Sequence, residues 1–403
     1  MAVVFRAIAP DEYPDLIRTM GLAFGFDPPD DDHFRHLLPL ERTVVGFDGS
    51  TMVSTAAAFP LEMTIPGGTV KCGGTTVVSV TPSHRRQGLL RGMMRSHLDE
   101  VLEQEEPIAA LWASDSAIYG RFGYGQAAVG YDVKVRRDHV DFHRLAPLPA
   151  SVRNIDATEA EKLLAPFYEH IRTSMPGFYA RSPVWWEHRV LADPEHRREG
   201  ATAYRFGVVD GPDGIAGYVQ YRIKSDWDDS HGAGKVMVKD LFGTTPESWA
   251  GLWSYVLNHD LISEITADHR STQDPLFDLL AGTRRAKAQR FDSLWVRIMD
   301  VPGALAARSY SAPVDVVLGV HDPMGDIEGR YHLVASAEGA ECGRTDSEPS
   351  ITLDAESLGA IYMGRSRLRA LSRIGRLLGD AESLAAADAA FTWEPQPWCP
   401  EVF

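Results

Sequence analysis

The stretch that most constrains the fold of this chain runs from residue 75 to residue 124. Residues 75–80 form an apolar, β-branched run that predicts a buried strand, and Pro82 ends it. A basic turn with the sequence RRQG follows at residues 85–88, and apolar side chains recur at helical spacing from Leu89 to Leu102. The sequence therefore predicts a strand that leads through a basic turn into a helix.

The basic turn is a candidate anion site. The first backbone N–H groups of a helix have no partner within the helix, and the helix dipole adds positive character at that end. Arg85 and Arg86 directly precede the predicted helix, and Gly88 lets the backbone approach a ligand closely. The two arginines could also be ordinary surface charges, but a glycine at a strand-to-helix turn favours diphosphate binding.

Length and composition indicate a globular protein of two or three domains. The chain has 403 residues, of which 44% are hydrophobic and 24% charged, so it can bury a sizeable core. No apolar run approaches the roughly 18 residues needed to span a bilayer, and the N-terminus has no signal-like pattern. We therefore expect a soluble, cytoplasmic protein that does not act on membranes.

Charge and cysteine content exclude several classes of function. A net charge of −16 argues against nucleic-acid binding and is compatible with a cationic substrate, although solubility alone also explains it. Cys72, Cys342 and Cys399 are far apart and have no neighbouring Cys or His partners, so we predict neither a disulfide framework nor a metal site.

Periodicity in the rest of the chain predicts further elements. Strands are expected at residues 42–59 as a hairpin, and at 61–70, 108–113, 204–209, 217–223, 235–242, 316–320, 329–335 and 351–353. Helices are expected at residues 157–172, 246–257, 355–362, 366–378 and 384–391. The aromatic residues Phe178, Tyr179, Trp185 and Trp186 either line a substrate pocket or pack in a core.

Two motifs resemble those of a known family. Val78, Ser79 and Val80, followed by the turn and Leu90, resemble the acetyl-CoA signature of GNAT acyltransferases, with leucine in place of the final small residue. Ser114, the run IYGRFGYG at residues 118–125, the length of the chain and its end at Phe403 extend this likeness. Together they resemble the enhanced-intracellular-survival (Eis) family of N-acetyltransferases.

The resemblance implies a fold of mixed α/β and α+β class. Two tandem GNAT-like domains, residues 1–145 and 146–293, precede a sterol-carrier-like α+β domain at residues 294–403. In the first domain, two parallel strands of the central sheet would splay apart and hold the pantetheine of acetyl-CoA. In the second domain residues 236–242 occupy the position of the cofactor strand, but no Arg-Arg-x-Gly turn follows, so this domain would lack a cofactor site.

The resemblance also implies site residues. The contacts to acetyl-CoA would be Val78, Ser79, Val80, Arg85, Arg86, Gln87, Gly88, Leu89, Leu90, Arg91, Ser114 and Asp115. Tyr119 would be the general acid, because an unperturbed tyrosine has a pKa of about 10, close to that of an alkyl thiol. Tyr124 is the rival for this role.

The implied base is the terminal carboxylate of Phe403. The last eleven residues contain three prolines and three aromatic residues, which suits a docked tail, although a tail packed on its own domain explains them equally well. Asp27 and Glu401 are candidate contacts for a substrate amine, and their alternative is an ordinary solvated carboxylate.

The sequence thus predicts an acetyl-CoA-dependent N-acetyltransferase. The expected acceptors are amines of polycationic small molecules, such as aminoglycosides, or lysine side chains, and the donor could be another acyl-CoA. The alternative is a lipid-binding or regulatory protein that uses the sterol-carrier-like domain. The resemblance also implies a homo-oligomer, a hexamer.

Overall fold

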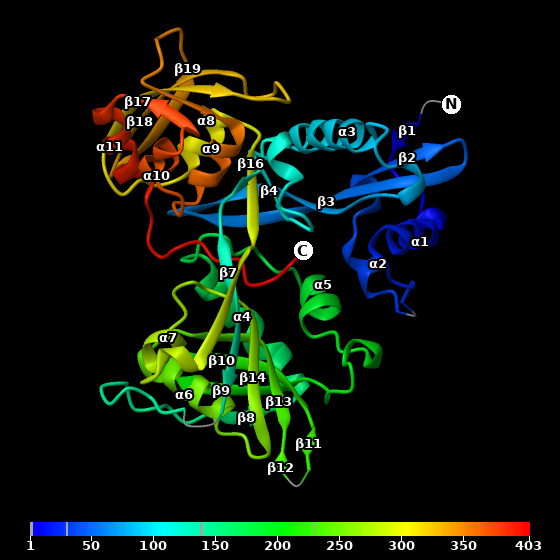
Figure 1. Cartoon of the computed structure of the whole chain (residues 1–403), viewed down its shortest axis with the longest axis vertical. Helices are drawn as coiled ribbons and strands as arrows, with labels where there is room; N and C mark the ends of the chain where they lie inside the picture. Colours follow the sequence, from blue (N-terminus) through cyan, green and yellow to red (C-terminus); the bar gives the residue numbers. More distant parts are fainter. Residues whose placement is uncertain (1–2, 30, 138–139, 230) are drawn as a thin grey trace.

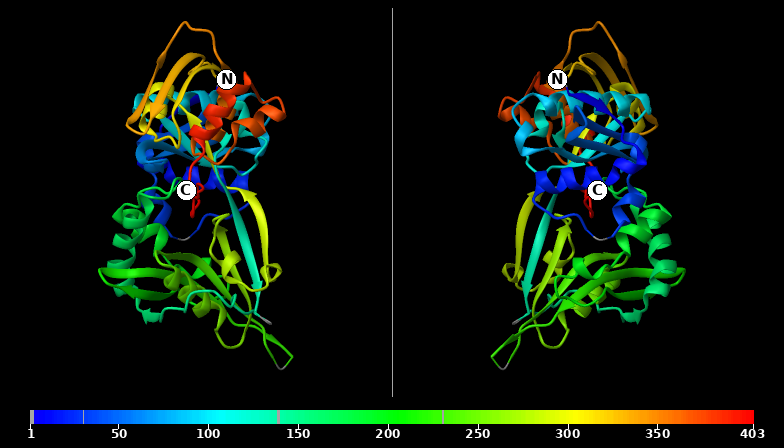
Figure 2. Two further views of the ribbon diagram at one scale, coloured as in Figure 1. Left: turned by 90° about the vertical axis from the view of Figure 1, so that its left-hand side faces the viewer. Right: turned by 90° about the vertical axis from the view of Figure 1, so that its right-hand side faces the viewer.

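The structure is a computed structural model that describes residues 3–29, 31–137, 140–229 and 231–403. Figure 1 shows an elongated molecule in two halves, and Figure 2 shows the same division from both sides. The first and third parts of the chain form the upper half, and the second part forms the lower half. The C-terminus lies between the halves.

The first sheet has seven strands in the order β1-β2-β3-β4-β5-β16-β6. The strands are β1 (Val4–Arg6), β2 (Thr43–Asp48), β3 (Thr51–Ile65), β4 (Gly68–Val80), β5 (Ile108–Trp112), β6 (Gly125–Gln126) and β16 (Leu294–Ile298). Helix α3 (Leu89–Glu103) packs on β2 and β3, and α1 (Tyr13–Phe24) packs on β3 and β4. The two helices lie on either side of the sheet (Figure 1).

Strands β4 and β5 diverge, as the resemblance implies. Their parallel ladder joins only residues 72–74 to residues 108–110, after which β4 continues to Val80. A bulge in β4 lies opposite β3, and Val77 there adopts a positive φ of 49°. The edge of β4 beyond the ladder therefore faces a widening gap, where an open α/β sheet commonly binds its ligand.

The second sheet also has seven strands, in the order β15-β7-β14-β13-β10-β9-β8. Its strands are β7 (Val129–Arg136), β8 (Arg153–Ile155), β9 (Arg205–Gly211), β10 (Gly214–Lys224), β13 (Gly234–Gly243), β14 (Ile262–Arg270) and β15 (Ala286–Asp292). Helices α4 (Ala157–Arg172) and α6 (Pro246–Leu257) pack on β10 and β9. A short α5 (Pro183–Trp185) continues into a π-helical turn, η5 (Trp186–Val190).

Two chain segments exchange between the sheets. The segment that forms β6 continues into β7 in the lower sheet, and the segment that forms β15 continues into β16 in the upper sheet. β7 pairs antiparallel with β15, and β6 pairs antiparallel with β16, so a two-stranded ribbon joins the halves. The chain crosses from β15 to β16 at residue 293, where a boundary was expected, whereas it crosses from β6 to β7 between residues 126 and 129, before the boundary expected at residue 145.

The third part of the chain forms a five-stranded sheet in the order β19-β18-β17-β20-β21. Its elements are α8 (Val301–Ala307), β17 (Val314–His321), β18 (Gly329–Ser336), β19 (Gly339–Arg344), β20 (Ile351–Asp354), α9 (Ala355–Tyr362), α10 (Leu368–Arg373), β21 (Leu377–Gly379) and α11 (Ala381–Phe391). The helix expected at residues 366–378 is therefore wrong in its second half. Gly375, with a φ of 75°, ends the helical course, and residues 377–379 pair with β20 instead.

A buried ion pair ties this domain to the first sheet. The guanidinium of Arg297, on β16, is fully buried and donates to Asp322 at 2.9 Å, to Asp326 at 2.7 Å and to the carbonyl of Phe122 at 2.6 Å. Burial acts to raise the pKa of Asp322, but the hydrogen bonds and charge of Arg297 outweigh it, so this pKa is lowered. Within the described residues, no helix is long and apolar enough to cross a membrane.

Replacing Arg297 should destabilise the protein strongly. The change Arg297→Ala leaves the buried carboxylate of Asp322 without its cation, which costs about 3–5 kcal/mol of unfolding free energy. Urea denaturation followed by fluorescence measures this loss. The matched change Arg153→Ala removes an exposed arginine that pairs with Asp210 and Glu159, and it should leave the midpoint nearly unchanged. Equal midpoints for the two variants would contradict this reading of the ion pair.

Candidate active site

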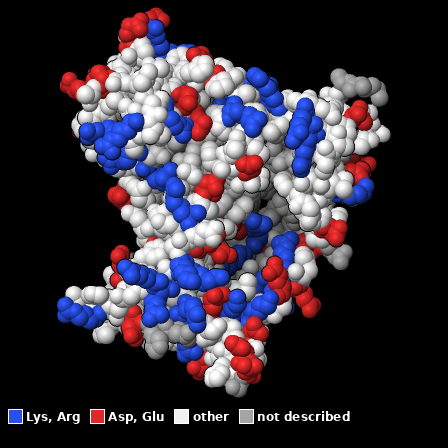
Figure 3. Space-filling view, viewed as in Figure 1, with Lys and Arg blue, Asp and Glu red and all other residues white. Residues whose placement is uncertain are grey.

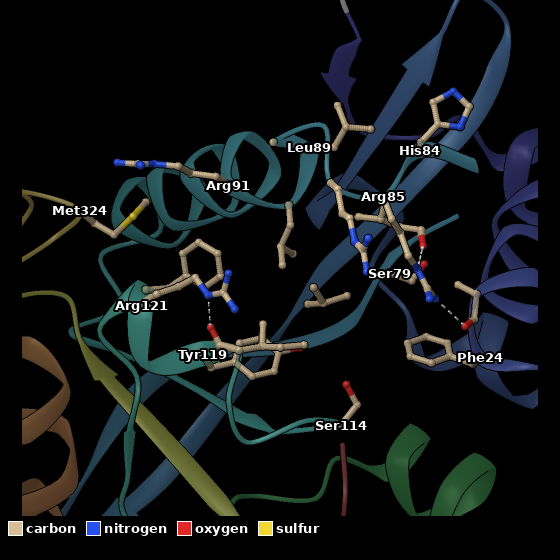
Figure 4. Close-up of a pocket in the computed structure, with 18 of the residues that line it drawn as sticks. Phe24, Ser79, His84, Arg85, Leu89, Arg91, Ser114, Tyr119, Arg121 and Met324 are labelled. Atoms are coloured by element: carbon tan, nitrogen blue, oxygen red, sulfur yellow. Dashed lines mark hydrogen bonds between the residues drawn. The ribbon is translucent and has the colours of Figure 1, made fainter. Parts of the chain in front are cut away.

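A cavity of about 810 Å³ opens where β4 and β5 diverge. It lies beside the start of α3, and the loop that carries Met324, in the third domain, closes one side (Figure 4). Its lining residues are Ala23, Phe24, Val78, Ser79, Val80, His84, Arg85, Arg86, Gly88, Leu89, Leu90, Arg91, Ser114, Ile118, Tyr119, Arg121, Phe122, Pro323 and Met324. Ten of the twelve residues that the sequence assigned to acetyl-CoA are among them.

The start of α3 faces this cavity without a side-chain cap. Arg86 and Gly88 adopt positive φ angles of 63° and 82°, which turn the chain sharply from β4 into the helix. No side chain of the described residues caps the helix at Gly88, and Leu89 and Leu90 line the cavity. The first N–H groups of α3 are therefore available to an anion, and the two arginines of the turn add positive charge.

Arg85 and Gln87 in the turn, and Asp115 in the loop after β5, make hydrogen bonds within the protein. Arg85 donates to the carbonyl oxygens of Val80 at 3.3 Å and Ala23 at 3.4 Å, so it also ties the turn to β4 and α1 (Figure 4). Gln87 does not line the cavity, because its amide turns back to the carbonyl of Ser83 at 3.3 Å. Asp115 does not line it either, since its carboxylate accepts from the backbone N–H of Ala117 at 2.9 Å. The contacts of Gln87 and Asp115 with acetyl-CoA stay predictions.

The two candidate tyrosines occupy different environments. Tyr119, on the 3-10 turn η4 (Tyr119–Phe122), lines the cavity, as does Ser114, and burial raises the pKa of Tyr119. Tyr124 is fully buried, and its hydroxyl bonds to Thr75 Oγ1 at 2.8 Å, which in turn bonds to His97 Nε2 at 2.8 Å. Tyr124 therefore closes the base of the gap between β4 and β5, and Tyr119 faces the space inside.

A second cavity, of about 330 Å³, meets the first at Phe24, which lines both. Strand β4 lines both cavities: Thr76 and Val77 line the second cavity, and residues 78–80 line the first. The residues that line the second cavity are Ile17, Met20, Phe24, Phe26, Pro29, Phe34, Leu37, Phe59, Thr76, Val77, Trp185, Arg189, Arg197 and Phe403. The C-terminal residue of the chain thus lies in this cavity.

Contacts on three sides hold Phe403. Its backbone oxygen accepts from Thr76 Oγ1 at 3.3 Å, and its ring packs edge-on against Tyr179 with centroids 5.4 Å apart. Arg189 donates to the carbonyl of Val402 at 2.8 Å. Asp27, by contrast, is exposed on the loop after α1, between two residues that line the cavity, so its predicted contact with a substrate stays a prediction.

Glu401 fixes the tail rather than facing the cavity. Its buried carboxylate accepts from Tyr179 Oη and Trp185 Nε1, both at 3.0 Å, and lies 3.2 Å from Arg181 and 3.5 Å from Arg189. Burial acts to raise its pKa, but the cations, Arg181 above all, lower it to about 2. Partners within the protein therefore satisfy this carboxylate, and its predicted contact with a substrate stays a prediction.

The tail lies where two strands of the second sheet diverge. The parallel ladder between β13 and β14 ends at Val238 and Ala267. Beyond it, Trp398 Nε1 donates to the carbonyl of His269 on β14 at 2.6 Å, and the Trp398 ring lies 5.3 Å from that of Phe242 on β13. The chain's own end therefore occupies the place that corresponds to the cofactor gap of the first sheet.

Sequence reasoning did not identify several residues of the two cavities. Met324 comes from the third domain, and Phe34 and Arg197 come from segments whose local patterns show only a short helix and a loop. Of the four aromatic residues singled out in the second domain, Trp185 lines the cavity, whereas Phe178 and Trp186 pack in the core. The described part of the chain holds no group of three or more His, Cys, Asp or Glu side chains suited to a metal ion.

Comparisons with known proteins agree with this geometry. Models of the Acetyltransferase (GNAT) domain match residues 4–127 and 177–298, and a model of the Sterol carrier protein domain matches residues 301–400. An uncharacterized N-acetyltransferase of Streptomyces avermitilis is 36% identical, over 97% of this chain and 96% of its own. N-acetyltransferase Eis of Mycobacterium tuberculosis is 33% identical over 97% of both chains.

A solved structure extends the likeness to three dimensions. The crystal structure of Eis1 from Mycobacterium abscessus superposes with a TM-score of 0.85 over the full length of both chains, at 28% identity. Sequence, domain order and fold therefore agree across the whole length. The chain belongs to the Eis family of GNAT N-acetyltransferases.

Proposed function

We propose that this N-acetyltransferase uses acetyl-CoA as its donor and a primary amine as its acceptor. The observation that supports the proposal is that two cavities meet at Phe24, one beside an uncapped helix start and the other lined by the chain's own terminal residue, Phe403. A thioester that enters from one side and an amine that enters from the other would come together at this point. Such positioning is a large part of the catalysis of acyl transfer.

The first cavity supplies what coenzyme A needs. Its diphosphate would lie on the N–H groups at the start of α3, with Arg86 and Arg91 beside it. Its pantetheine would run along the edge of β4 from Thr75 to Val80, where β5 has already turned away. Backbone N–H and C=O groups of Val78 and Val80 on this edge can pair with the pantetheine amides.

Tyr119 is the proposed general acid. As the amine nitrogen attacks the thioester carbon, a C–N bond forms, the C–S bond breaks, and Tyr119 Oη gives its proton to the departing sulfur. Burial raises the pKa of Tyr119, so the side chain stays protonated, as a proton donor must, at neutral pH. Tyr124 is less suited, because Thr75 already engages its hydroxyl at the base of the gap.

The carboxylate of Phe403 is the proposed base. It would hold the acceptor nitrogen and take the proton that the nitrogen loses as the amide forms. Most of the residues that line the second cavity with Phe403 are aromatic or aliphatic, and Arg189 and Arg197 line it as well. The aminoglycosides or lysine side chains expected from the sequence would offer an amine of the required kind.

The lipid-binding alternative finds less support. A lipid carrier needs an apolar cavity in its own domain, whereas buried side chains such as Leu318, Leu333 and Leu358 occupy the interior of the third domain. The cavity with the largest volume of those described here lies in the first domain, and arginines as well as Met324 line it.

The proposal can be tested by measuring thiol release from acetyl-CoA with and without an amine. Amine-dependent release, with the acetylated amine identified by mass spectrometry, is the expected result. A protein that binds no acetyl-CoA in calorimetry and releases no thiol would contradict the proposal.

The change Arg86→Ala should weaken donor binding. Loss of one charge-assisted contact to a phosphate predicts a dissociation constant for acetyl-CoA about 10-fold higher. Isothermal titration calorimetry measures it. Arg373→Ala removes an exposed arginine on α10, outside both cavities, and should leave the constant unchanged. If both variants bind acetyl-CoA like the parent protein, Arg86 is only a surface charge.

The change Tyr119→Phe should lower kcat by at least about 100-fold, because it removes the proton donor. Binding of acetyl-CoA should persist. Tyr124→Phe is the matched control: it removes a hydroxyl that bonds only to Thr75 in the described hydrogen-bond network, so it should lower stability by about 1 kcal/mol and leave kcat nearly intact. A larger loss of kcat in Tyr124→Phe would reverse the assignment.

Adding one alanine after Phe403 should abolish most of the activity, since it moves the carboxylate out of position. The expected loss in kcat is about 100-fold or more. Phe403→Leu is the control, because it keeps the terminal carboxylate and removes only the ring contact with Tyr179. Full turnover by the extended chain, measured by thiol release, would rule out the carboxylate as the base.

A further inference from the structure

Three histidines, which we call the histidine cluster, meet where the first two domains face each other beside the second cavity. His33 and His36 lie on α2 (His33–Leu37) of the first domain, and His188 lies on η5 of the second. His33 Nδ1 is 3.0 Å from His188 Nδ1, and the rings of His36 and His188 are stacked, with centroids 4.3 Å apart and planes at 12°. His188 is therefore the centre of the cluster, and the cluster joins the two domains.

The histidine cluster connects two walls of the second cavity. Phe34 and Leu37 of α2 form part of one wall, and Trp185 and Arg189 form part of the other. Helix α2 packs on α5 and η5 (Figure 1). A helix of five residues is too short to be stable by itself in water, so α2 depends on packing against its neighbours for its position and its helical form.

The geometry of the cluster limits the protons that it can hold. A hydrogen bond between two Nδ1 atoms needs one donor and one acceptor, so His33 and His188 cannot both be doubly protonated while this bond exists. If both His36 and His188 were protonated, two cations would stack face to face. Protons on His33 and His36 are compatible with the cluster only when His188 is neutral. His188 is thus the imidazole whose protonation the closed cluster excludes.

Two exposed carboxylates lie near the cluster. Asp32 Oδ2 is 3.3 Å from His36 Nε2, and Glu187 Oε1 is 3.8 Å from His188 Nε2. The side chains of Asp32 and Glu187 are 78% and 74% exposed, so water screens their attraction for a proton on either ring. Direct contacts among the imidazoles therefore outweigh these carboxylates.

Other charged groups surround the cluster on the segments that pack against it. Among the described residues they are Asp27, Asp31, Arg35, Arg189, His196, Arg197 and Lys239. Asp31 is shared by Arg197 and His196, at 3.3 Å and 3.2 Å, and its carboxylate also accepts from the backbone N–H of His33. Asp27 is exposed, and within the described part of the chain it makes no hydrogen bond or ion pair with the cluster. Figure 3 shows acidic and basic atoms close together at the right of the hollow between the halves, where α2 and α5 lie in Figure 1.

We infer that His188 is a positioning residue that holds the α2 wall of the second cavity in place only while its own imidazole is neutral. Protonated His188 would meet a second N–H donor on protonated His33 or a stacked cation at His36, so α2 would leave the second domain and the cavity would lose Phe34 and Leu37. The detached state binds one proton more than the closed state, and falling pH therefore favours it. The effect on acceptor binding rests on the proposed function, whereas the movement of α2 does not.

Hydrogen–deuterium exchange of the full chain tests the inference. The backbone N–H groups of Arg35, His36 and Leu38 donate to carbonyls of Asp32 and Phe34, and they should exchange when α2 detaches. After division by the intrinsic rate at each pH, exchange of residues 33–38 should be about 10-fold faster at pH 5.5 than at pH 7.5. This is the factor for one extra proton on an unperturbed imidazole, whose pKa is about 6.5. Exchange in α6 should change little.

The change His188→Asn removes the titrating group. Asparagine places an amide atom near the position of Nδ1 but gains no proton at these pH values. The ratio of the exchange rates at the two pH values should therefore fall to about 1, whether α2 in this variant is held or free. His332→Gln is the matched control, because it removes an exposed histidine that pairs with Asp315 in the third domain. It should keep the ratio of the parent protein.

Three results would overturn the inference. They are equal exchange of residues 33–38 at the two pH values in the parent protein, an unchanged ratio in His188→Asn, and a rise in α6 exchange as large as that in α2, which would indicate general destabilisation. None of these measurements needs turnover. A protein that neither binds acetyl-CoA nor releases thiol would therefore overturn the proposed function and leave the exchange test intact.

Kinetics with kanamycin as the acceptor give a second arm. From pH 7.5 to pH 5.5, the KM for kanamycin should rise by a factor at least about 3-fold larger in the parent protein than in His188→Asn. The KM for acetyl-CoA should change equally in both proteins. Protonation of the amine and of Phe403 affects both proteins alike and cancels in this comparison. Equal changes in the KM for kanamycin would overturn the role of His188 in the acceptor cavity.

Discussion

The site depends on the buried ion pair between Glu401 and Arg181. Chain ends usually fray, but here a carboxylate two residues from the end is enclosed by Tyr179, Trp185 and two arginines. Arg181 also lies 3.1 Å from the buried Asp240, so the tail is fixed to the second sheet. Because the folded pKa of Glu401 is lowered to about 2, this stabilisation is complete above the ordinary pKa of a glutamate and is lost as pH falls toward 2.

Both GNAT domains contain a pair of parallel strands that diverge. In each sheet two parallel strands part, and the gap offers unpaired backbone edges. In the first domain a basic turn and an uncapped helix suit that gap to an anionic cofactor. In the second domain no such turn is present in the sequence after residue 242, and Trp398 fills the gap. The second domain therefore contributes to the site by holding the end of the chain.

Local patterns in the sequence correctly predicted helices whose ends depend on nearby residues. Helices expected at residues 157–172, 246–257 and 355–362 have those bounds in the structure, because apolar periodicity and N-terminal caps define them. The basic turn was also predicted from local sequence, because RRQG lies between a strand pattern and a helix pattern. Strands β14 and β15 and the exchange of β7 and β16 were missed, since pairing between distant segments creates them. The second cavity could not be predicted from local patterns, because they do not show which distant residues share a wall: Arg197 was not identified, and Phe403 was named only through the family resemblance.

The exchanged ribbon has a consequence for how the protein is made. The upper sheet lacks the strand between β5 and β6 until β16 has been synthesised, about 170 residues after β6. At translation rates of about 5–20 residues per second, this leaves β5 with an open edge for on the order of ten to thirty seconds on the ribosome. An unpaired apolar edge is a template for wrong association. The first domain of this chain can therefore complete its sheet only after the second domain has been synthesised and the chain has returned with β16.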